Sequence, residues 1–322
     1  MSSPTPRQST RDVTVRGMRE ADLPEVARIV RVAFGTFFGL PDPQTLWPDR
    51  DPVNTRWRAA PASTLVAEMH DRIVGSNFAT HWGSFAFFGP LTVEPELWSQ
   101  GIAQVMLGPT VDLFDQWAVE QSGLFTFAHS TKHVNLYQKF GFWARFLTAM
   151  MAKSVEDPSD AGATRFSTLG EGQRGEALTA CRELTDGIFE GLDVTVDILS
   201  VHNQNLGETI LLWGGDRLDA FAVCHCGAGS EAGADICYIK FAAVRPGAEA
   251  ARIFDQLLQA CEGLAAGRGL HRLEAGVNLG RAEAYRAMLR HAFRSQAQGV
   301  AMHRPDSPGY NRPEVFVLDD WR

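Results

Sequence analysis

The strongest signal for the fold is the segment LTVEPELWSQGIA, Leu91–Ala103. Its first residues end an apolar run over 85–93, which predicts a strand buried on both faces. The strand stops at Glu94-Pro95, and apolar residues at helical spacing predict a helix from Gly101. A helix N-terminus offers unpaired backbone N–H groups and a positive dipole end. The segment therefore predicts a site for an anion such as a diphosphate.

The elements on either side of this segment follow a β-α-β-β-β-α-β-α-β order. Strands are expected at 13–16, 64–69, 73–82, 85–93, 123–128 and 143–153, and helices at 22–34, 101–119 and 133–140. We expect Asp22 to cap the first of these helices and Gly141 to end the last one.

The same order returns in the second half of the chain. The sequence VEPELWSQGIAQVML from Val93 aligns without gaps with VRPGAEAARIFDQLL from Val244, 151 residues later. Tyr137 similarly matches Tyr285, 148 residues later, and a turn at 71–72 matches one at 216–217. Matches at nearly one spacing predict a tandem duplication.

The duplication divides the chain into four ranges. We expect a flexible tail over 1–12, a first domain over 13–153, a polar linker (SVEDPSDAGA) over 154–163 and a second domain over 164–322. The expected fold class is α/β (α+β), with a duplicated mixed sheet flanked by helices.

Composition excludes several classes of protein. The 322 residues are 45% hydrophobic and carry a net charge of −8, of which residues 1–150 account for −1 and residues 151–322 for −7. This balance argues against nucleic-acid binding. No apolar run is long enough to span a membrane, and the N-terminus does not resemble a signal peptide. A cytoplasmic protein with reduced thiols is expected.

The five cysteines all lie in the second half of the chain, and two of them flank His225 in the sequence Cys224-His225-Cys226. This motif could hold a metal, but alternate residues of a strand share one face and no second pair stands at zinc-like spacing. We expect buried thiols and no metal.

A second motif, LYQKFGF over 136–142, places Tyr137 on a short helix that ends at Gly141. Taken alone, it indicates a tyrosine at the edge of the core. Combined with the Leu91–Ala103 segment about 40 residues earlier, it resembles the GNAT acetyltransferase superfamily. The resemblance covers about Val13 to Lys153, and the second half repeats it more faintly.

The resemblance implies an acetyl-CoA-dependent N-acetyltransferase, in which a primary amine attacks the thioester directly in a ternary complex. Leu91 and Val93 would pair through their backbones with the pantetheine arm, and Tyr137 would protonate the departing thiolate. The diphosphate would be bound by N–H groups of Ser99, Gln100, Gly101, Ile102 and Ala103.

Two positions depart from the family pattern. Trp98 stands where a basic or amide side chain usually opens the loop. Ser130 stands where an asparagine is common, and we expect it to bind the cofactor there or to cap the helix.

Removal of the amine proton requires a base or a water path. His129 is the preferred candidate because it lies at a strand end just before the helix that carries Tyr137. His81, His133 and Glu68 are further candidates, and a water-mediated path stays open.

Trp47 and Trp57 are candidates for walls of the acceptor pocket. Asp42, Asp49 and Asp51 would either attract a cationic amine or belong to a solvated loop.

In the second half, Arg252 and Phe254 replace Gly101 and Ala103. We therefore expect a degenerate half that serves as a scaffold or helps to form the acceptor site.

The expected partners are acetyl-CoA and a small-molecule or peptide amine, and the protein would be a monomer or homodimer. The alternative is a non-catalytic acyl-CoA-binding or regulatory protein.

Overall fold

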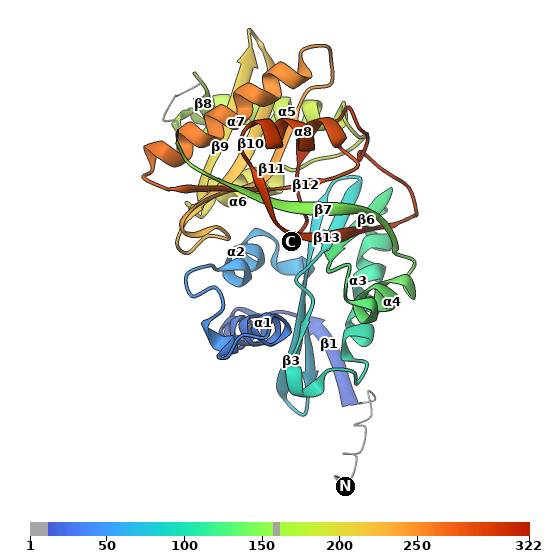
Figure 1. The fold of residues 1–322 in the computed structure, drawn as a ribbon. Coiled ribbons are helices and arrows are strands. Elements are labelled where there is room, and N and C mark those ends of the chain that lie inside the picture. Colours follow the sequence, from blue (N-terminus) through green and yellow to red (C-terminus); the bar gives the residue numbers. More distant parts are fainter. Residues whose placement is uncertain (1–11, 157–161) are drawn as a thin grey trace.

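The computed structural model describes residues 12–156 and 162–322. The predicted tail, except for its last residue, and the middle of the predicted linker lie outside these residues. The described chain forms two stacked halves, with Arg322 lying between them (Figure 1).

Each half contains a mixed sheet with helices on its faces, so the predicted fold class is confirmed. The strands of the first half are β1 (Val13–Gly17), β2 (Thr64–Met69), β3 (Arg72–Trp82), β4 (Phe85–Phe88), β5 (Thr92–Val93), β6 (Gln121–Thr126) and β7 (Trp143–Ser154). Those of the second half are β8 (Thr164–Arg165), β9 (Gly207–Gly214), β10 (Arg217–Gly227), β11 (Gly233–Val244), β12 (Arg272–Asn278), β13 (Arg294–Arg304) and β14 (Val317–Leu318).

The helices repeat the same arrangement in both halves. The first half has α1 (Leu23–Phe37), α2 (Pro52–Ala59), α3 (Ile102–Gln116) and α4 (Thr131–Gln138). The second half has α5 (Glu171–Asp186), α6 (Thr195–Asn203), α7 (Ala250–Gly267) and α8 (Ala282–Arg290). Short 3-10 turns precede α1, β2 and α3, and others lie at 43–45 and 166–168.

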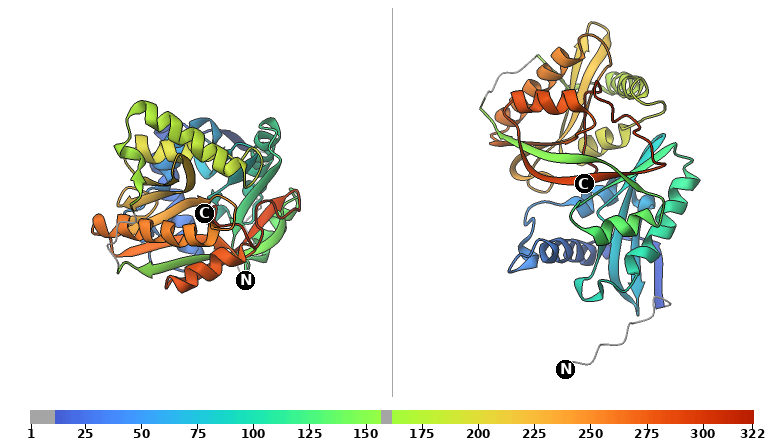
Figure 2. Two further views of the ribbon diagram at one scale, coloured as in Figure 1. Left: turned by 90° about the horizontal axis from the view of Figure 1, so that it is seen from above. Right: turned by 45° about the vertical axis from the view of Figure 1, so that its right-hand side comes forward.

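The two halves share one continuous path of paired strands. Its order is β1-β2-β3-β4-β6-β13-β7-β12-β11-β10-β9-β8. β13 of the second half therefore lies between β6 and β7 of the first, and β7 in turn pairs with β12. Both strands cross the middle of the molecule (Figure 2). The domain bounds 13–153 and 164–322 stay a prediction. In the structure the last long strand of each range, β7 or β13, pairs with strands of the other half.

A shared apolar core joins the halves. Trp82, Phe85 and Phe87 of the first half pack with buried residues of α5, α6, β10 and β11. Alternate residues of β4 face the other way: Ala86 and Phe88 pack against α3 and α4. The strand β4 is thus buried on both faces, as the apolar run predicted.

Three local predictions need correction. The expected strand over 85–93 is divided at 89–91: β4 and β5 both pair with β3, but only β4 also pairs with β6. The repeated order also predicts a strand over 165–169 at the start of the second half, but only Thr164–Arg165 is paired, since a 3-10 turn follows. The Asp22 side chain does not cap α1: its carboxylate accepts the Arg19 N–H and pairs with Arg16 at 2.6 Å.

Candidate coenzyme site

The site is built where β4 and β6 part. They pair in parallel up to Phe88 and Leu124, and beyond this point β5 continues alongside β3 alone while β6 stays with β13. The parting leaves a gap in the sheet between the segment 89–93 and the end of β6. α3 and α4 pack on one face of this region.

The loop that enters α3 has the backbone geometry of an anion cradle. Ser99 has φ 66° and Gly101 has φ 88°, both in the left-handed region. Within the described chain, no hydrogen bond is found for the backbone N–H groups of Ser99, Gln100, Gly101, Ile102 and Ala103. Five neighbouring donors at the start of a 15-residue helix can bind a diphosphate without a basic side chain.

Val93 presents a free edge next to this loop. Glu94 N–H donates to Val74 O at 2.9 Å and Thr92 is paired with Ser76, so the N–H and C=O of Val93 point away from β3. The Val93 carbonyl accepts a hydrogen bond from Trp98 Nε1 at 2.7 Å. The indole that replaces the usual polar side chain thus takes one of the groups that the resemblance assigns to pantetheine.

Lys132 supplies a positive charge that sequence analysis missed. No Lys or Arg stands between Arg72 and Lys132, and this gap was the available signal. Lys132 lies in the first turn of α4, where its Nζ donates to Ser99 Oγ at 3.0 Å and lies 5.7 Å from the centre of the Trp98 ring. An exposed ammonium beside this loop adds a positive charge that Trp98 does not supply.

Tyr137 is buried on the same face of the sheet as the loop. Its ring contacts Phe88, the last residue of β4, with 5.7 Å between ring centres. Leu91 packs against this cluster and against the cluster that includes Ile102. Burial raises the pKa of Tyr137 above its usual range, so the phenol keeps its proton at neutral pH and can serve as an acid. Gly141 ends α4 with φ 84°, as expected.

His129 lies in a different environment. It is exposed and its ring lies 5.8 Å from Phe37, at the C-terminal end of α1. His133 packs against the same ring at 5.5 Å, and burial, together with Lys132 and His129, lowers the pKa of His133. Ser130 occupies the N-cap position of α4, but its side chain makes no capping hydrogen bond.

The remaining candidate bases do not join the site. His81 stacks on Trp117 at 4.6 Å, at the far end of α3 from Gly101. With 15 residues, α3 is about 22 Å long. Glu68 forms an ion pair with Arg16 at 2.6 Å.

The proposed acceptor residues near α2 have structural roles. Asp42 and Asp51 accept backbone N–H groups at helix starts, and Asp49 accepts the Ala234 N–H at 2.6 Å. Trp57 donates to Met18 O at 3.3 Å, and Trp47 packs in the same core cluster. These five residues fix the fold around α1 and α2.

The second half has no equivalent loop. α7 begins at Ala250, only six residues after Val244, whereas α3 begins nine residues after Val93. The gapless alignment placed Arg252 and Phe254 at the positions of Gly101 and Ala103, where large side chains would obstruct a diphosphate. In the structure neither residue stands in a loop of this kind. Arg252 is exposed and pairs with Glu249, and Phe254 is fully buried in the core of the second half.

Cys224, Cys237 and Cys261 are buried, and Cys226 is half-buried. The described residues include no group of three or more side chains placed to hold a metal ion. Over the same residues, no helix has both the length and the apolar character needed to cross a bilayer.

Comparisons with known proteins agree with this geometry. Residues 29–142 match the model of the acetyltransferase (GNAT) family. No curated protein matches the sequence at a significant level.

Three solved structures share the fold. A candidate acetyltransferase from Pyrococcus horikoshii superposes with TM-score 0.69 and 12% identity, over 100% of this chain and 99% of that one. A GCN5-related N-acetyltransferase from Sphaerobacter thermophilus gives 0.58 and 15%, over 92% and 96%.

The third structure contains the glucosamine N-acetyltransferase region of a fungal multi-domain β-N-acetylglucosaminidase. It gives a TM-score of 0.63 and 14% identity, over 90% of this chain and 38% of that one. At these identities the three likenesses show the fold. The family match over 29–142 shows an acetyltransferase (GNAT) domain in the first half, and the chain as a whole shares the fold of the three structures.

Proposed function

We propose that this protein is an acetyl-CoA-dependent N-acetyltransferase that transfers the acetyl group directly to a primary amine in a ternary complex. One observation carries the proposal: five neighbouring N–H groups of 99–103 are unpaired at the start of α3, after the unpaired Val93 N–H, and the protonated Tyr137 packs on Phe88 at the end of β4.

The roles follow from this arrangement. Acetyl-CoA would be bound by the N–H groups of 99–103 with Lys132 beside them, and its pantetheine arm would lie along Leu91 and Val93. The Val93 N–H is available for the developing charge on the thioester oxygen. Tyr137 would give its proton to the thiolate as it leaves.

The acceptor would be a small molecule or a peptide amine that approaches from the face opposite α3. His129, alone or through water, would take the proton that the attacking ammonium must lose. The aromatic residues Phe37 and Phe127, which stack around His129, favour an amine attached to an apolar group.

The test is release of free thiol from acetyl-CoA in the presence of a panel of amines, with product mass measured to show the added acetyl group. Turnover with an amine and a matching product mass support the proposal. The proposal is wrong if acetyl-CoA does not bind, as measured by calorimetry on the full chain.

A second candidate function is acyl-CoA binding without turnover. The hydrogen bond from Trp98 to the Val93 carbonyl favours it, because that carbonyl is then not free for pantetheine. Tight binding with no thiol release on any amine would support this second function. Restoration of turnover by Trp98→Gln would attribute the loss to the indole.

A further inference from the structure

The segment 314–321 lies in the second half along the edge that corresponds to Leu91–Val93. β14 pairs antiparallel with Ala242 and Ala243, and Val244 N–H donates to Phe316 O at 3.0 Å. Ala242 and Val244 stand 151 residues after Leu91 and Val93. The chain's own backbone therefore occupies the edge that is free in the first half.

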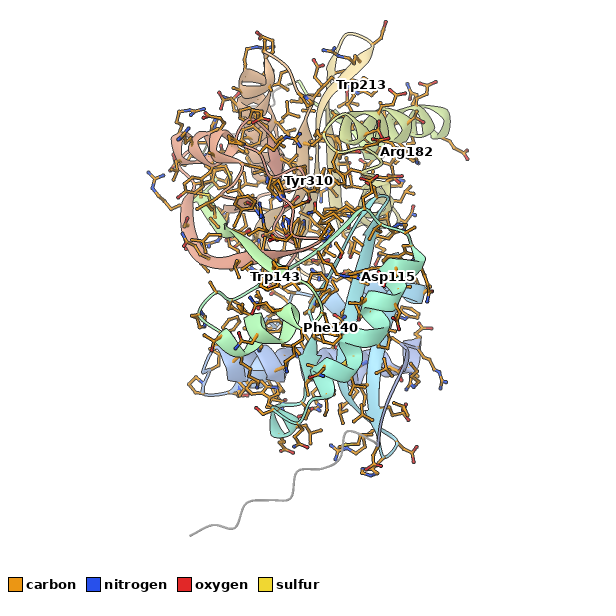
Figure 3. All side chains as sticks on the ribbon, turned by 90° about the vertical axis from the view of Figure 1, so that its right-hand side faces the viewer. Asp115, Phe140, Trp143, Arg182, Trp213 and Tyr310 are labelled. Carbon is orange, nitrogen blue, oxygen red and sulfur yellow. The ribbon has the colours of Figure 1, made fainter. Side chains whose placement is uncertain are left out.

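Buried polar groups hold this segment in place. Arg281, which is fully buried, donates to Val317 O at 2.7 Å and pairs with Asp319 at 2.6 Å. Tyr310 donates to Asp319 at 2.8 Å, and it lies inside the second half in Figure 3. Hydrogen bonds between charged groups are stronger than those between neutral groups. In a buried site, neither Arg281 nor Asp319 can exchange its partner for water. The course of the segment is thus set by the second half.

From there the segment leads directly to the first half. The Trp321 ring lies 4.9 Å from the ring of Phe85 and against Gly123, where an added Cβ would come within 2.7 Å of the indole. Gly123 is the partner of Phe87 in the parallel pairing of β4 with β6. The next pair, Phe88 with Leu124, is the last before the two strands part.

A second contact holds the strand beyond this pair. Arg56, buried between the halves, donates to Gly89 O at 2.7 Å and to the backbone oxygen of Arg322. Arg56 also pairs with Glu231 of the second half at 2.6 Å. Trp321 therefore contacts β4 and β6 where they begin to separate. Arg322 is linked through Arg56 to Gly89, the residue after β4.

We infer that Trp321 is a positioning residue for acetyl transfer. The segment that fills the second half's edge presses the indole on the Phe87–Gly123 pair and so fixes the separation of β4 and β6 where the thioester would lie. The inference rests on the proposed function, because it assigns Trp321 a role in that reaction. Trp321 acts through the two strands and on the face away from α3 and α4.

The experiment compares two aromatic residues of the same segment. Phe316 is 7% exposed and packs at 5.2 Å on Phe254, in the core of the second half, whereas Trp321 is 5% exposed and packs on β4 and β6. Trp321→Leu and Phe316→Leu each remove one buried ring, so both lower the melting temperature. Only Trp321→Leu is expected to lower kcat, by about tenfold, through misplacement of the thioester.

The split between kcat and binding separates positioning from stability. The Kd for coenzyme A is expected to stay within about twofold in both variants, because the diphosphate loop is untouched. Trp321→Phe, which keeps a ring on Gly123, is expected to recover most of the lost kcat. Equal losses of kcat in Trp321→Leu and Phe316→Leu, or no loss in Trp321→Leu, would overturn the inference.

Two further measurements keep the result decisive. If Trp321→Leu does not fold, Gly123→Ala tests the same contact from the strand side and is expected to lower kcat in the same way. Hydrogen exchange of the β4 and β6 amides is expected to rise in Trp321→Leu and not in Phe316→Leu. This readout needs no activity, so it decides the packing even if a failure of acetyl-CoA to bind contradicts the proposed function.

Discussion

The two halves end corresponding strands in opposite ways. In the first half, the Val93 N–H is unpaired, and the residue is followed by a turn, two positive φ angles and then α3. In the second half, Val244 is paired with Phe316, and α7 begins three residues sooner. A strand that parts from its neighbour can thus be completed by a ligand or by the chain itself. Which of these occurs depends on the loop before the helix and on a spare segment nearby.

The largest expected effect comes from a large side chain placed in the loop before α3. Gly101→Arg puts a side chain at φ 88° among the unpaired N–H groups. Backbone strain and lost charge-assisted hydrogen bonds together amount to more than about 4 kcal/mol, so acetyl-CoA affinity should fall about 1000-fold. Isothermal titration calorimetry measures this loss.

The matched control is Gly108→Arg, in the same helix, where an added Cβ meets no atom within 4 Å. It is expected to leave affinity unchanged. Parent-like affinity in Gly101→Arg would disprove the assignment of the loop.

Loss of the acid has the next largest effect. Tyr137→Phe removes the proton donor, and kcat should fall about 100-fold with little change in the KM for acetyl-CoA. Steady-state thiol release measures both constants. Tyr285→Phe, the counterpart in the second half, should leave both constants as they are. A comparable drop in the two variants would contradict the asymmetry between the halves.

Lys132 gives a smaller effect. Lys132→Gln should raise the KM for acetyl-CoA about fivefold and weaken its dependence on ionic strength, because one exposed ion pair is lost. Lys139→Gln, just beyond the end of α4, serves as the control and should behave like the parent. If the salt dependence is the same in Lys132→Gln and the parent, this lysine does not contact the phosphates.

The smallest effect concerns stability at the junction of the halves. Burial lowers the pKa of His303 from 6.5 to about 4, and its ring lies 5.4 Å from that of Trp321. The unfolded chain then binds a proton that the folded chain does not, so stability falls as pH decreases from 6.5 toward 4. At pH 6 the loss is about 0.7 kcal/mol relative to pH 7.

Denaturant unfolding between pH 7 and pH 5 measures this slope. His303→Gln should flatten it by about one proton. An unchanged slope in His303→Gln would show that the ring titrates normally.

Much of the fold was predictable from local pattern. The spacing of apolar residues predicted β2, β3 and the helices α1, α3 and α4 to within a few residues. Gly141 ended its helix as expected, because a positive φ favours glycine. The strand over 85–93 was predicted whole because hydrophobicity does not report which neighbour each residue pairs with.

The candidate site was less predictable. Lys132 was missed because its role depends on Ser99, 33 residues earlier, and no periodicity links them. Asp42, Asp49 and Asp51 read equally well as charges for a ligand or as loop residues, and their backbone partners decide for structure. Arg252 and Phe254 marked the second half as different, but the shorter loop and the pairing of β14 are the physical causes.

The sequence by itself determined the elements, their repeated order, the phosphate-type loop before α3 and the tyrosine on α4, because these depend on residues close together in the chain. Only the tertiary structure decided that β7 and β13 interlock, that 314–321 fills the second half's edge and that Trp321 lies on Gly123. Such contacts join residues up to about 200 positions apart. They are set by packing and by buried charges such as Arg281, which local sequence pattern does not encode.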